Sequence, residues 1–282
     1  MRYDDFEELR ITISDKIAEW QIIRPEKLNA MRHKTFWEIM ELGRRLNTDP
    51  EVRAVVATHE GRGFSAGADL TAEDPGAESS SNPRPGKNDS MGVSGVGMAM
   101  PLIDKPTIAA IDGVCAGAGM SLALSFDIRI VGPNANFLTI FTRRALGPDC
   151  GLTYHLPRLV GQGKALELMY TSRDVRAEEA VRIGLANTLV DDPRAYALEM
   201  ARELADGPPL SLMWEKREVM HTWEASLQEQ IEFEWSAQKQ IEQSSDVREG
   251  KRAFIESLTE TGMNLGLEGR FRLTPSVDDM TV

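Results

Sequence analysis

Two glycine-containing turns in the chain could each present a main-chain N–H to negative charge. Residues 64–70 read Phe-Ser-Ala-Gly-Ala-Asp-Leu after the apolar run at 54–58, and residues 111–127 hold three glycines within seven positions before an apolar segment with helical spacing. Glycine lets the backbone approach a ligand closely, although Gly-x-Gly at such a junction can equally serve close packing alone. The first N–H groups of a helix are free, so the two turns could supply one donor each to a single phosphate or carbonyl oxygen.

Four motifs, taken together, resemble the enoyl-CoA hydratase/isomerase (crotonase) superfamily from roughly residue 8 to residue 258. They are the two turns, Arg-Pro-Glu-Lys-Leu-Asn-Ala at residues 24–30 and Leu-Pro-Arg-Leu-Val-Gly at residues 156–161. The resemblance implies an α/β fold, a crotonase-like spiral of β-β-α units with a helical C-terminal region, and an acyl-CoA thioester as substrate. It leaves the reaction open, because this fold supports hydratases, isomerases, dehalogenases, decarboxylases and hydrolases.

The resemblance assigns an oxyanion hole to the main-chain N–H groups of Ala68 and Ala118, the latter next to Gly117. Chemistry beside a thioester carbonyl places negative charge on its oxygen, and losing one of two such donors raises the barrier by about 3–4 kcal/mol. Hydratases of the superfamily use two glutamates twenty positions apart, and those positions are Ser121 and Phe141 here. Ser121 can position a water but is no base near neutral pH, which excludes a two-carboxylate hydratase mechanism.

Asp149, within Leu-Gly-Pro-Asp-Cys-Gly at residues 146–151, is the carboxylate that could do the chemistry instead. Some isomerases of the superfamily carry an aspartate there, and the resemblance extends to the ring-epoxide/enoyl-CoA isomerase type of phenylacetate breakdown. One carboxylate suffices for a 1,3-shift, because it can remove a proton and return it elsewhere while the oxyanion hole holds the dienolate. The sequence therefore favours an acyl-CoA isomerase with Asp149 as acid and base.

Other interpretations stay open beside the isomerase. Asp149, helped by Ser121, could activate water in an enoyl-CoA hydratase or an acyl-CoA hydrolase, or the chain could be a non-catalytic CoA-binding homologue. Asp149 could also merely N-cap a helix beginning near Thr153, a position at which aspartate is common.

The resemblance also implies contacts to coenzyme A, which is part of the substrate, so that no separate cofactor is expected. Ser65, Ala66 and Ala68 would cradle the adenine through their main chain, next to Asp69 and Leu70. The other expected contacts are the cations Arg24 and Lys27 for the phosphates, Glu26 with Lys27 and Leu28 beside the pantetheine and adenine, and Phe141 against the acyl chain.

Composition limits the partners and the compartment. The chain has 32 Lys and Arg against 44 Asp and Glu, a formal net charge of −12, which disfavours nucleic acid and anionic membrane surfaces. Cys115 and Cys150 build neither a disulfide framework nor a metal-ligand spacing. No apolar run approaches the ~18 residues of a membrane span and no signal peptide is recognised, so we expect a cytoplasmic protein. The resemblance implies a homotrimer or a dimer of trimers.

Hydrophobic periodicity predicts the elements that position these residues. Residues 9–23 predict a hairpin of two strands, residues 31–46 a helix packed on one face, and residues 54–58 a strand in parallel pairing. The polar, Pro/Gly/Ser-rich tract at 71–94 is expected to be a flexible lid rather than an idle insertion. Residues 210–242 predict one long amphipathic helix.

We expect three parts in the chain. Residues 1–205 would form the crotonase-like spiral core, residues 206–270 a C-terminal helical region for oligomerisation or for covering the site, and residues 271–282 a tail.

Overall fold

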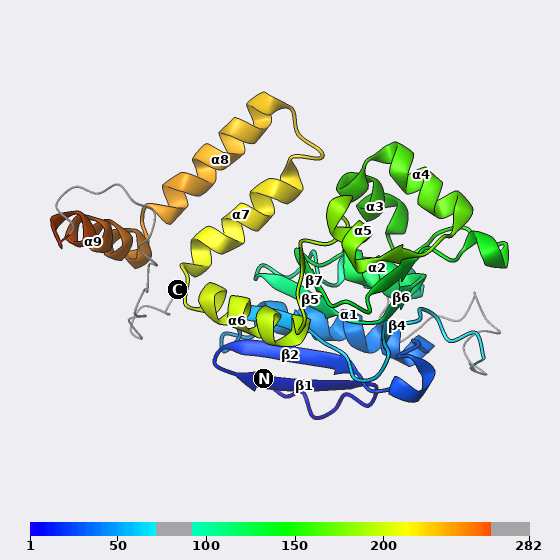
Figure 1. Ribbon diagram of the computed structural model, residues 1–282. Helices are drawn as coiled ribbons and strands as arrows, with labels where there is room; N and C mark the ends of the chain where they lie inside the picture. Colours follow the sequence, from blue (N-terminus) through cyan, green and yellow to red (C-terminus); the bar gives the residue numbers. More distant parts are fainter. Residues whose placement is uncertain (72–91, 261–282) are drawn as a thin grey trace.

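The computed structural model describes residues 1–71 and 92–260 of the 282-residue chain (Figure 1). Its strands form a six-stranded sheet in the order β1-β2-β3-β5-β7-β10 and a four-stranded sheet in the order β4-β6-β8-β9. The strands are β1 (Leu9–Ser14), β2 (Ile17–Ile22), β3 (Ala54–Ala57), β4 (Gly63–Ser65), β5 (Thr107–Ile111), β6 (Val114–Ala116), β7 (Ile128–Val131), β8 (Asn136–Leu138), β9 (Val175–Arg176) and β10 (Thr188–Leu189).

Helices cover both sheets and make up the C-terminal part. The α-helices are α1 (His33–Thr48), α2 (Ala118–Leu124), α3 (Leu152–Val160), α4 (Gln162–Thr171), α5 (Ala177–Arg182), α6 (Pro193–Ala205), α7 (Pro209–His221), α8 (Leu227–Ile241) and α9 (Ser245–Glu260). Short 3-10 helices are η1 (Pro25–Lys27), η2 (Gly92–Met98) and η3 (Thr142–Arg144). None of the helices within the two described ranges is long and apolar enough to cross a membrane.

The first hairpin and the first helix are confirmed. β1 and β2 pair antiparallel, and the two-residue turn between them puts both Asp15 and Lys16 at positive φ, 51° and 63°. Two central residues at positive φ match the right-handed twist of the flanking strands. β2 then pairs in parallel with β3, as expected, and α1 fills the connection between them.

Successive strands alternate between the two sheets, which is what makes the chain a spiral. β3, β5 and β7 belong to the six-stranded sheet, and the strands that directly follow them, β4, β6 and β8, belong to the other. The expected β-β-α spiral is confirmed. One detail differs from the sequence prediction: a second strand, three residues long, stands between each apolar strand and its glycine turn, because so short a strand leaves no periodic signal.

The six-stranded sheet is buried on both faces. Val55 of β3 points into the larger apolar core with α1, while its neighbour Val56 packs with Ala197 and Ala201 of α6 on the other face. Burial on both faces explains why β3 and β5 read as continuous apolar runs rather than as alternating ones.

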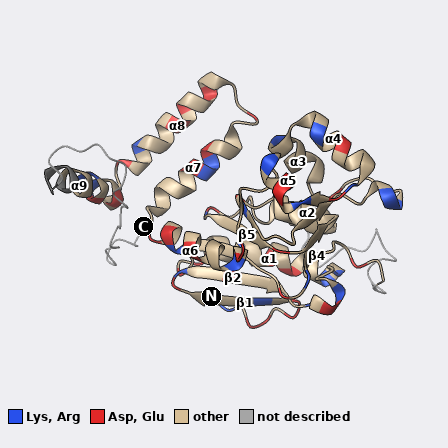
Figure 2. Ribbon diagram, viewed as in Figure 1, with Lys and Arg blue, Asp and Glu red and all other residues tan. Residues whose placement is uncertain are grey.

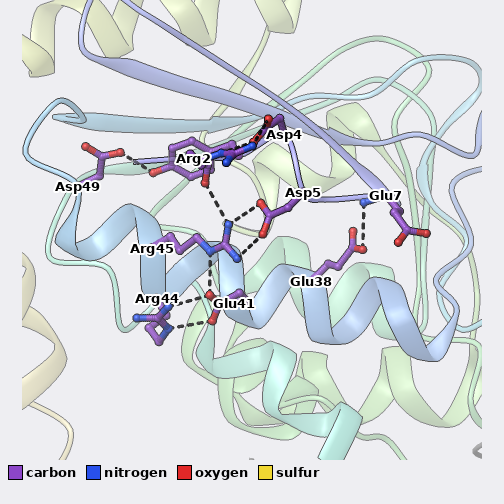
Figure 3. A network of polar contacts seen from close by, with 10 residues as sticks. Arg2, Asp4, Asp5, Glu7, Glu38, Glu41, Arg44, Arg45 and Asp49 are labelled. Carbon is purple, nitrogen blue, oxygen red and sulfur yellow. Dashed lines mark hydrogen bonds and ion pairs between the residues drawn. The ribbon is translucent and has the colours of Figure 1, made fainter. Parts of the chain in front are cut away.

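The N-terminal segment is held on α1 by charged groups (Figure 3). Arg45 donates to both oxygens of Asp5, at 2.6 and 2.8 Å, and to Glu41 at 2.8 Å, and its guanidinium lies over the Phe6 ring. Tyr3 donates to Asp49 at the end of the same helix. The paired arginines hold the pKa of Glu41 at about 2, well below its ordinary value.

The prediction of one long helix at residues 210–242 is wrong. The chain forms α7 and α8, which pack on each other and project from the sheets together with α9 (Figure 1). Ser226 begins α8 with a reciprocal capping box: its side chain accepts from the Glu229 N–H, and the Glu229 carboxylate accepts from the Ser226 N–H at 2.8 Å. A capping box starts a new helix, which explains the break. Both signs of charge occur along α7 and α8 (Figure 2).

Two expectations lie largely or wholly outside the described residues. The lid expected at 71–94 is described only at Thr71 and in its last three residues, which begin η2. The tail expected at 271–282 is not described at all, whereas residues 209–260 of the expected C-terminal region are helical apart from short connections.

Candidate active site

The two glycine-containing turns lie directly against each other. Gly67 has φ of +88°, and a Cβ built on it would stand 2.7 Å from the Ala116 carbonyl oxygen and 3.1 Å from the Ala118 nitrogen. A Cβ on Gly119 would stand 2.5 Å from the Ser65 oxygen. Only glycine tolerates such approaches, so both glycines are required for the turns to meet.

The main-chain N–H groups expected as donors are those of Ala68 and Ala118. Among the described residues, no hydrogen-bond acceptor is found for the N–H of Ala68 or for that of Ala118, the first residue of α2. Ala68 is exposed, whereas Ala118 is 5% exposed. A buried N–H without a partner is rare in folded proteins, so the Ala118 donor is a place where an acceptor from a ligand would be favourable.

Neighbouring segments fix both donors in position. On one side, the Met31 N–H donates to the Gly67 oxygen at 2.8 Å, and the Met31 oxygen accepts from the Asp69 N–H at 2.9 Å. These two bonds flank Ala68, whose own N–H takes no part in them. On the other side, Gly117 has φ of 52° and ψ of −126°, a conformation open to glycine, and donates to the Leu138 oxygen at 3.0 Å.

Asp149 lies on an exposed loop that is attached to α2 by its main chain. Ser121 is fully buried, and its hydroxyl lies 3.1 Å from the Asp149 carbonyl oxygen and 3.3 Å from that of Gly117, so that it can donate to either. Ser121 is three residues after Ala118 on α2, about 5 Å along the helix axis. The Asp149 backbone is therefore held one helical turn from the second expected donor.

A second contact supports the same loop from η2. A Cβ on Gly97 would stand 2.2 Å from the Cys150 oxygen, so the two backbones touch. The His155 ring is 3.3 Å from the Gly97 oxygen, and burial lowers the pKa of His155. Burial and the Asp149 carboxylate raise the pKa of the Cys150 thiol above its ordinary value, so that Cys150 is a neutral packing residue.

The capping alternative for Asp149 is not what the structure shows. The N-cap of α3 is Gly151, at φ of 81°, and no side chain caps this helix. Asp149 contributes only its main-chain oxygen, which accepts from the Leu152 N–H at 3.1 Å. Its carboxylate is thus not used as a helix cap.

Ser121 and Phe141, the positions of the missing glutamates, are both buried. Ser121 is directed at main-chain oxygens, and Phe141 is 7% exposed in the larger apolar core. Sequence reasoning missed the residue before Phe141. Ile140 has φ of 55°, a strained conformation for a β-branched residue. A Cβ built on Gly117 would stand 3.3 Å from the Ile140 Cγ2, so this side chain lies next to the second glycine turn.

The expected coenzyme A segment at residues 24–30 runs beside the first turn. The main-chain oxygen of Leu28, a residue at φ of 52°, accepts from the Ala66 N–H at 2.9 Å. The Ala66 N–H is therefore already used within the protein. Ser65 is fully buried and donates to the Asn29 oxygen at 2.8 Å. Leu70, after the first donor, is 63% exposed.

Arg24 is paired within the protein. Its guanidinium donates to Asp69 at 2.8 Å and to the Ala30 oxygen at 2.6 Å. Asp69 also accepts from the N–H and hydroxyl of Thr71, and the Arg24 and Thr71 bonds hold the pKa of Asp69 at about 2. Asp69 therefore fixes its own turn through these bonds.

Two other cations near this segment have no ion-pair partner among the described residues, Lys27 and Arg62. Both are exposed, and Arg62 lies between Gly61, which contacts Pro25, and Gly63, which contacts Leu28. Arg62 was missed from the sequence because it lies outside every motif. Within the described ranges no group of three or more His, Cys, Asp or Glu side chains is arranged to hold a metal ion.

Comparison with known proteins gives one consistent family. The family model described as enoyl-CoA hydratase/isomerase matches residues 12–261. The 1,2-epoxyphenylacetyl-CoA isomerase of Escherichia coli (strain K12) is 34% identical over 242 residues, 82% of this chain and 89% of that protein. The short-chain-enoyl-CoA hydratase of Clostridium acetobutylicum is 32% identical over 244 residues, 86% of this chain and 92% of that protein.

A solved structure agrees with these sequence relatives. A protein from Streptomyces coelicolor A3(2), provisionally described as an enoyl-CoA hydratase, superimposes with a TM-score of 0.83 at 35% identity. The match covers 91% of this chain and 94% of that one.

Proposed function

The chain belongs to the enoyl-CoA hydratase/isomerase family, and we propose that it is an acyl-CoA isomerase that works through a thioester enolate with Asp149 as the only acid and base. The observation that carries the proposal is the combination of two N–H groups, at Ala68 and Ala118, that have no acceptor within the described residues, with the exposed Asp149 carboxylate, whose loop is attached to α2. The isomerase from Escherichia coli among the relatives supports this choice.

The chemistry needs only these groups. The Asp149 carboxylate takes a proton from the α- or γ-carbon of the acyl chain, and the electron pair moves onto the thioester oxygen. The two N–H groups stabilise that oxygen anion, and protonated Asp149 returns the proton to the other end of the allylic system. Neither buried Ser121 nor buried Phe141 can act as a second base, which disfavours concerted hydration by two carboxylates.

Substrate binding would combine apolar and cationic surfaces. Two exposed leucines flank the groups proposed for chemistry: Leu70, two residues after Ala68, and Leu146, three residues before Asp149. They suit an apolar acyl group. Because Arg24 is paired with Asp69, we assign the phosphates of coenzyme A to Lys27 and Arg62 instead.

An oligomer is also part of the proposal. Leu227, Ile231 and Trp235 of α8 follow one another at four-residue spacing, so they share one helix face, and they are 77%, 55% and 58% exposed. A stripe of large apolar residues on a projecting helix is a typical protein contact. We propose that α8 contributes to a homotrimer or a dimer of trimers, whose mass sedimentation can measure.

The test is proton transfer by an Asp149→Asn variant. Incubation with a 3-enoyl-CoA and a 2-enoyl-CoA in deuterated water distinguishes double-bond migration, hydration and binding alone. Asp149→Asn should lower kcat by roughly 10²–10⁴ with little change in CoA-ester affinity or melting temperature. Asp191→Asn, which changes an exposed aspartate elsewhere, is the matched control and should be neutral.

Three results would count against the proposal. Retained turnover by Asp149→Asn would remove Asp149 from the mechanism. Appreciable hydration of the 2-enoyl-CoA by the unmodified protein would favour a hydratase that activates water with one exposed aspartate. Binding without any chemistry would leave a CoA-binding homologue.

A further inference from the structure

A cavity of about 240 Å³ lies between the start of α7 and the end of the six-stranded sheet at which β3 and β5 begin. On the helical side it is lined by Leu204 at the end of α6 and by Leu210 and Met213 of α7. On the side of the sheet it is lined by Arg53, directly before β3, and Lys105, two residues before β5. The proposed oxyanion turns follow β4 and β6 in the other sheet, so this cavity does not belong to the candidate active site.

The polar side of the cavity offers hydrogen-bond donors. Within the described residues, the Arg53 guanidinium has no hydrogen-bond or ion-pair partner. Lys105 donates from its ammonium to the Leu46 and Asp49 main-chain oxygens, both at 2.6 Å, and keeps a third hydrogen. Asn47, which also lines the cavity, uses its side-chain oxygen to accept from a main-chain N–H, and its two amide hydrogens have no partner in the described part of the chain.

The one carboxylate among the lining residues is already neutralised. Asp104 accepts from the Arg217 guanidinium through both oxygens, at 2.8 and 2.6 Å. Lys216, beside Arg217 on α7, is likewise engaged, with Asp127 at 2.9 Å. These two ion pairs fasten α7 over the cavity and engage the Asp104 carboxylate with Arg217.

Arg53 and Lys105 therefore line the cavity with unused hydrogen-bond donors and form no ion pair within the described residues. Burial lowers the pKa of Lys105 to about 8; the Asp49 and Asp104 carboxylates oppose this shift, and the positive charge of Arg53 adds to it. Two neighbouring cations that form no ion pair in the described part of the chain are unexpected where acidic residues outnumber basic ones, 44 to 32. An anion placed between the two groups would remove their repulsion and satisfy the free donors at once.

We propose that this cavity is a second binding site, for a small monocarboxylate with a short apolar chain. The carboxylate accepts from Arg53, Asn47 and Lys105, and the chain packs against Leu210 and Met213. On the scale of about 30 Å³ per water molecule, the volume corresponds to roughly eight non-hydrogen atoms, the size of hexanoate. A free phosphate would satisfy the donors but would leave the apolar wall uncovered.

The experiment is calorimetric titration of the full chain with hexanoate, 1-hexanol and acetate. Hexanoate should bind with 1:1 stoichiometry per chain, and both 1-hexanol, which lacks the charge, and acetate, which lacks the chain, should bind at least about tenfold more weakly. Arg53→Gln should weaken hexanoate about tenfold or more, and Met213→Trp should abolish binding by filling the cavity. Arg202→Gln, on the exposed side of α6 and outside the lining, should stay within about twofold.

Every other result overturns the proposal. Absence of hexanoate binding, equal binding of 1-hexanol, or unchanged binding by Arg53→Gln would each remove the carboxylate site. Hexanoate binding that persists in Met213→Trp would place the ligand elsewhere, including the acyl site. A change of sedimentation without a change of affinity in Met213→Trp would show that a second copy covers this surface. If Met213→Trp loses its circular dichroism, Leu210→Phe serves as the filling variant.

Discussion

Gly67→Ala should separate the catalytic role of the two touching turns from their contribution to stability. The new methyl group would stand 2.7 Å from the Ala116 oxygen and 3.1 Å from the Ala118 nitrogen, both of them main-chain atoms that cannot rotate away. Relief requires the turns to move apart, which displaces the Ala68 and Ala118 N–H groups relative to each other. Loss of one such donor costs about 3–4 kcal/mol, so kcat should fall by about 10²–10³.

The same substitution has a second cost that must be measured separately. Residue 67 has φ of +88°, and placing alanine in the left-handed region costs about 1–2 kcal/mol of folding free energy. Gly161→Ala is the matched control, because Gly161 has φ of +78° and its Cβ would meet nothing within 4 Å. The control should lose stability through its positive φ alone, which urea titration measures, and should keep its turnover.

The decisive assay is kcat for the acyl-CoA conversion, measured with both variants at a temperature where both are folded. Binding of the CoA ester should change little in Gly67→Ala, because the donors matter most when charge develops on the oxygen. If Gly67→Ala keeps turnover within about fivefold of Gly161→Ala, the contact between the turns does not set the geometry of the oxyanion hole and the reasoning fails.

Three further predictions concern side chains around the same site. Ser121→Ala should lower kcat by about 5–20-fold with KM unchanged, since it removes the hydroxyl that holds the Asp149 main chain, and steady-state kinetics with Ser121→Thr as the rescuing variant tests this. Asp69→Asn should cost about 1–2 kcal/mol of unfolding free energy above pH 4. This difference in unfolding free energy should vanish as pH falls from about 4 to about 2, because the folded-state pKa of Asp69, about 2, lies below its ordinary value. Urea titrations that show a constant difference across this range would contradict the prediction. Phe141→Glu should not create a hydratase and should destabilise the chain by about 2–4 kcal/mol, as it buries a carboxylate in the apolar core; new hydration of a 2-enoyl-CoA would refute this.

The parts of the fold predicted from the sequence are those with long periodic patterns. The hairpin of β1 and β2, the helix α1 and the strand β3 follow the expected ranges closely, because alternation or helical spacing runs through each of them. The strands β4 and β6 were missed because three residues carry no period. The break between α7 and α8 was missed because apolar residues continue on both sides of it, although Ser226 with Glu229 was a readable start signal.

The features of the candidate site that the sequence predicted are likewise the ones encoded by neighbouring residues, and the features it missed are contacts between distant residues. The glycine turns and the donors within them are encoded in a few adjacent residues, so motifs identify them. The ion pair of Arg24 with Asp69 joins residues 45 positions apart, and nothing in either local pattern shows that the arginine is already paired. The hydrogen bond from Ser121 to the Asp149 oxygen likewise spans 28 positions and depends on how α2 meets the loop.

The proposed catalytic groups differ in how the protein holds them, and this difference bears on the choice of reaction. The two N–H groups are fixed by backbone contacts between Gly67, Gly119 and their neighbours, an arrangement that any enolate-forming member of the fold could use. The carboxylate instead extends from a loop whose main chain is tied to Ser121 and touches Gly97. A glutamate at position 121 would break the first of these ties and displace the loop. Serine at 121 with aspartate at 149 and a glutamate pair are therefore two alternative arrangements, and the first of them supports the proposal of a single-carboxylate isomerase.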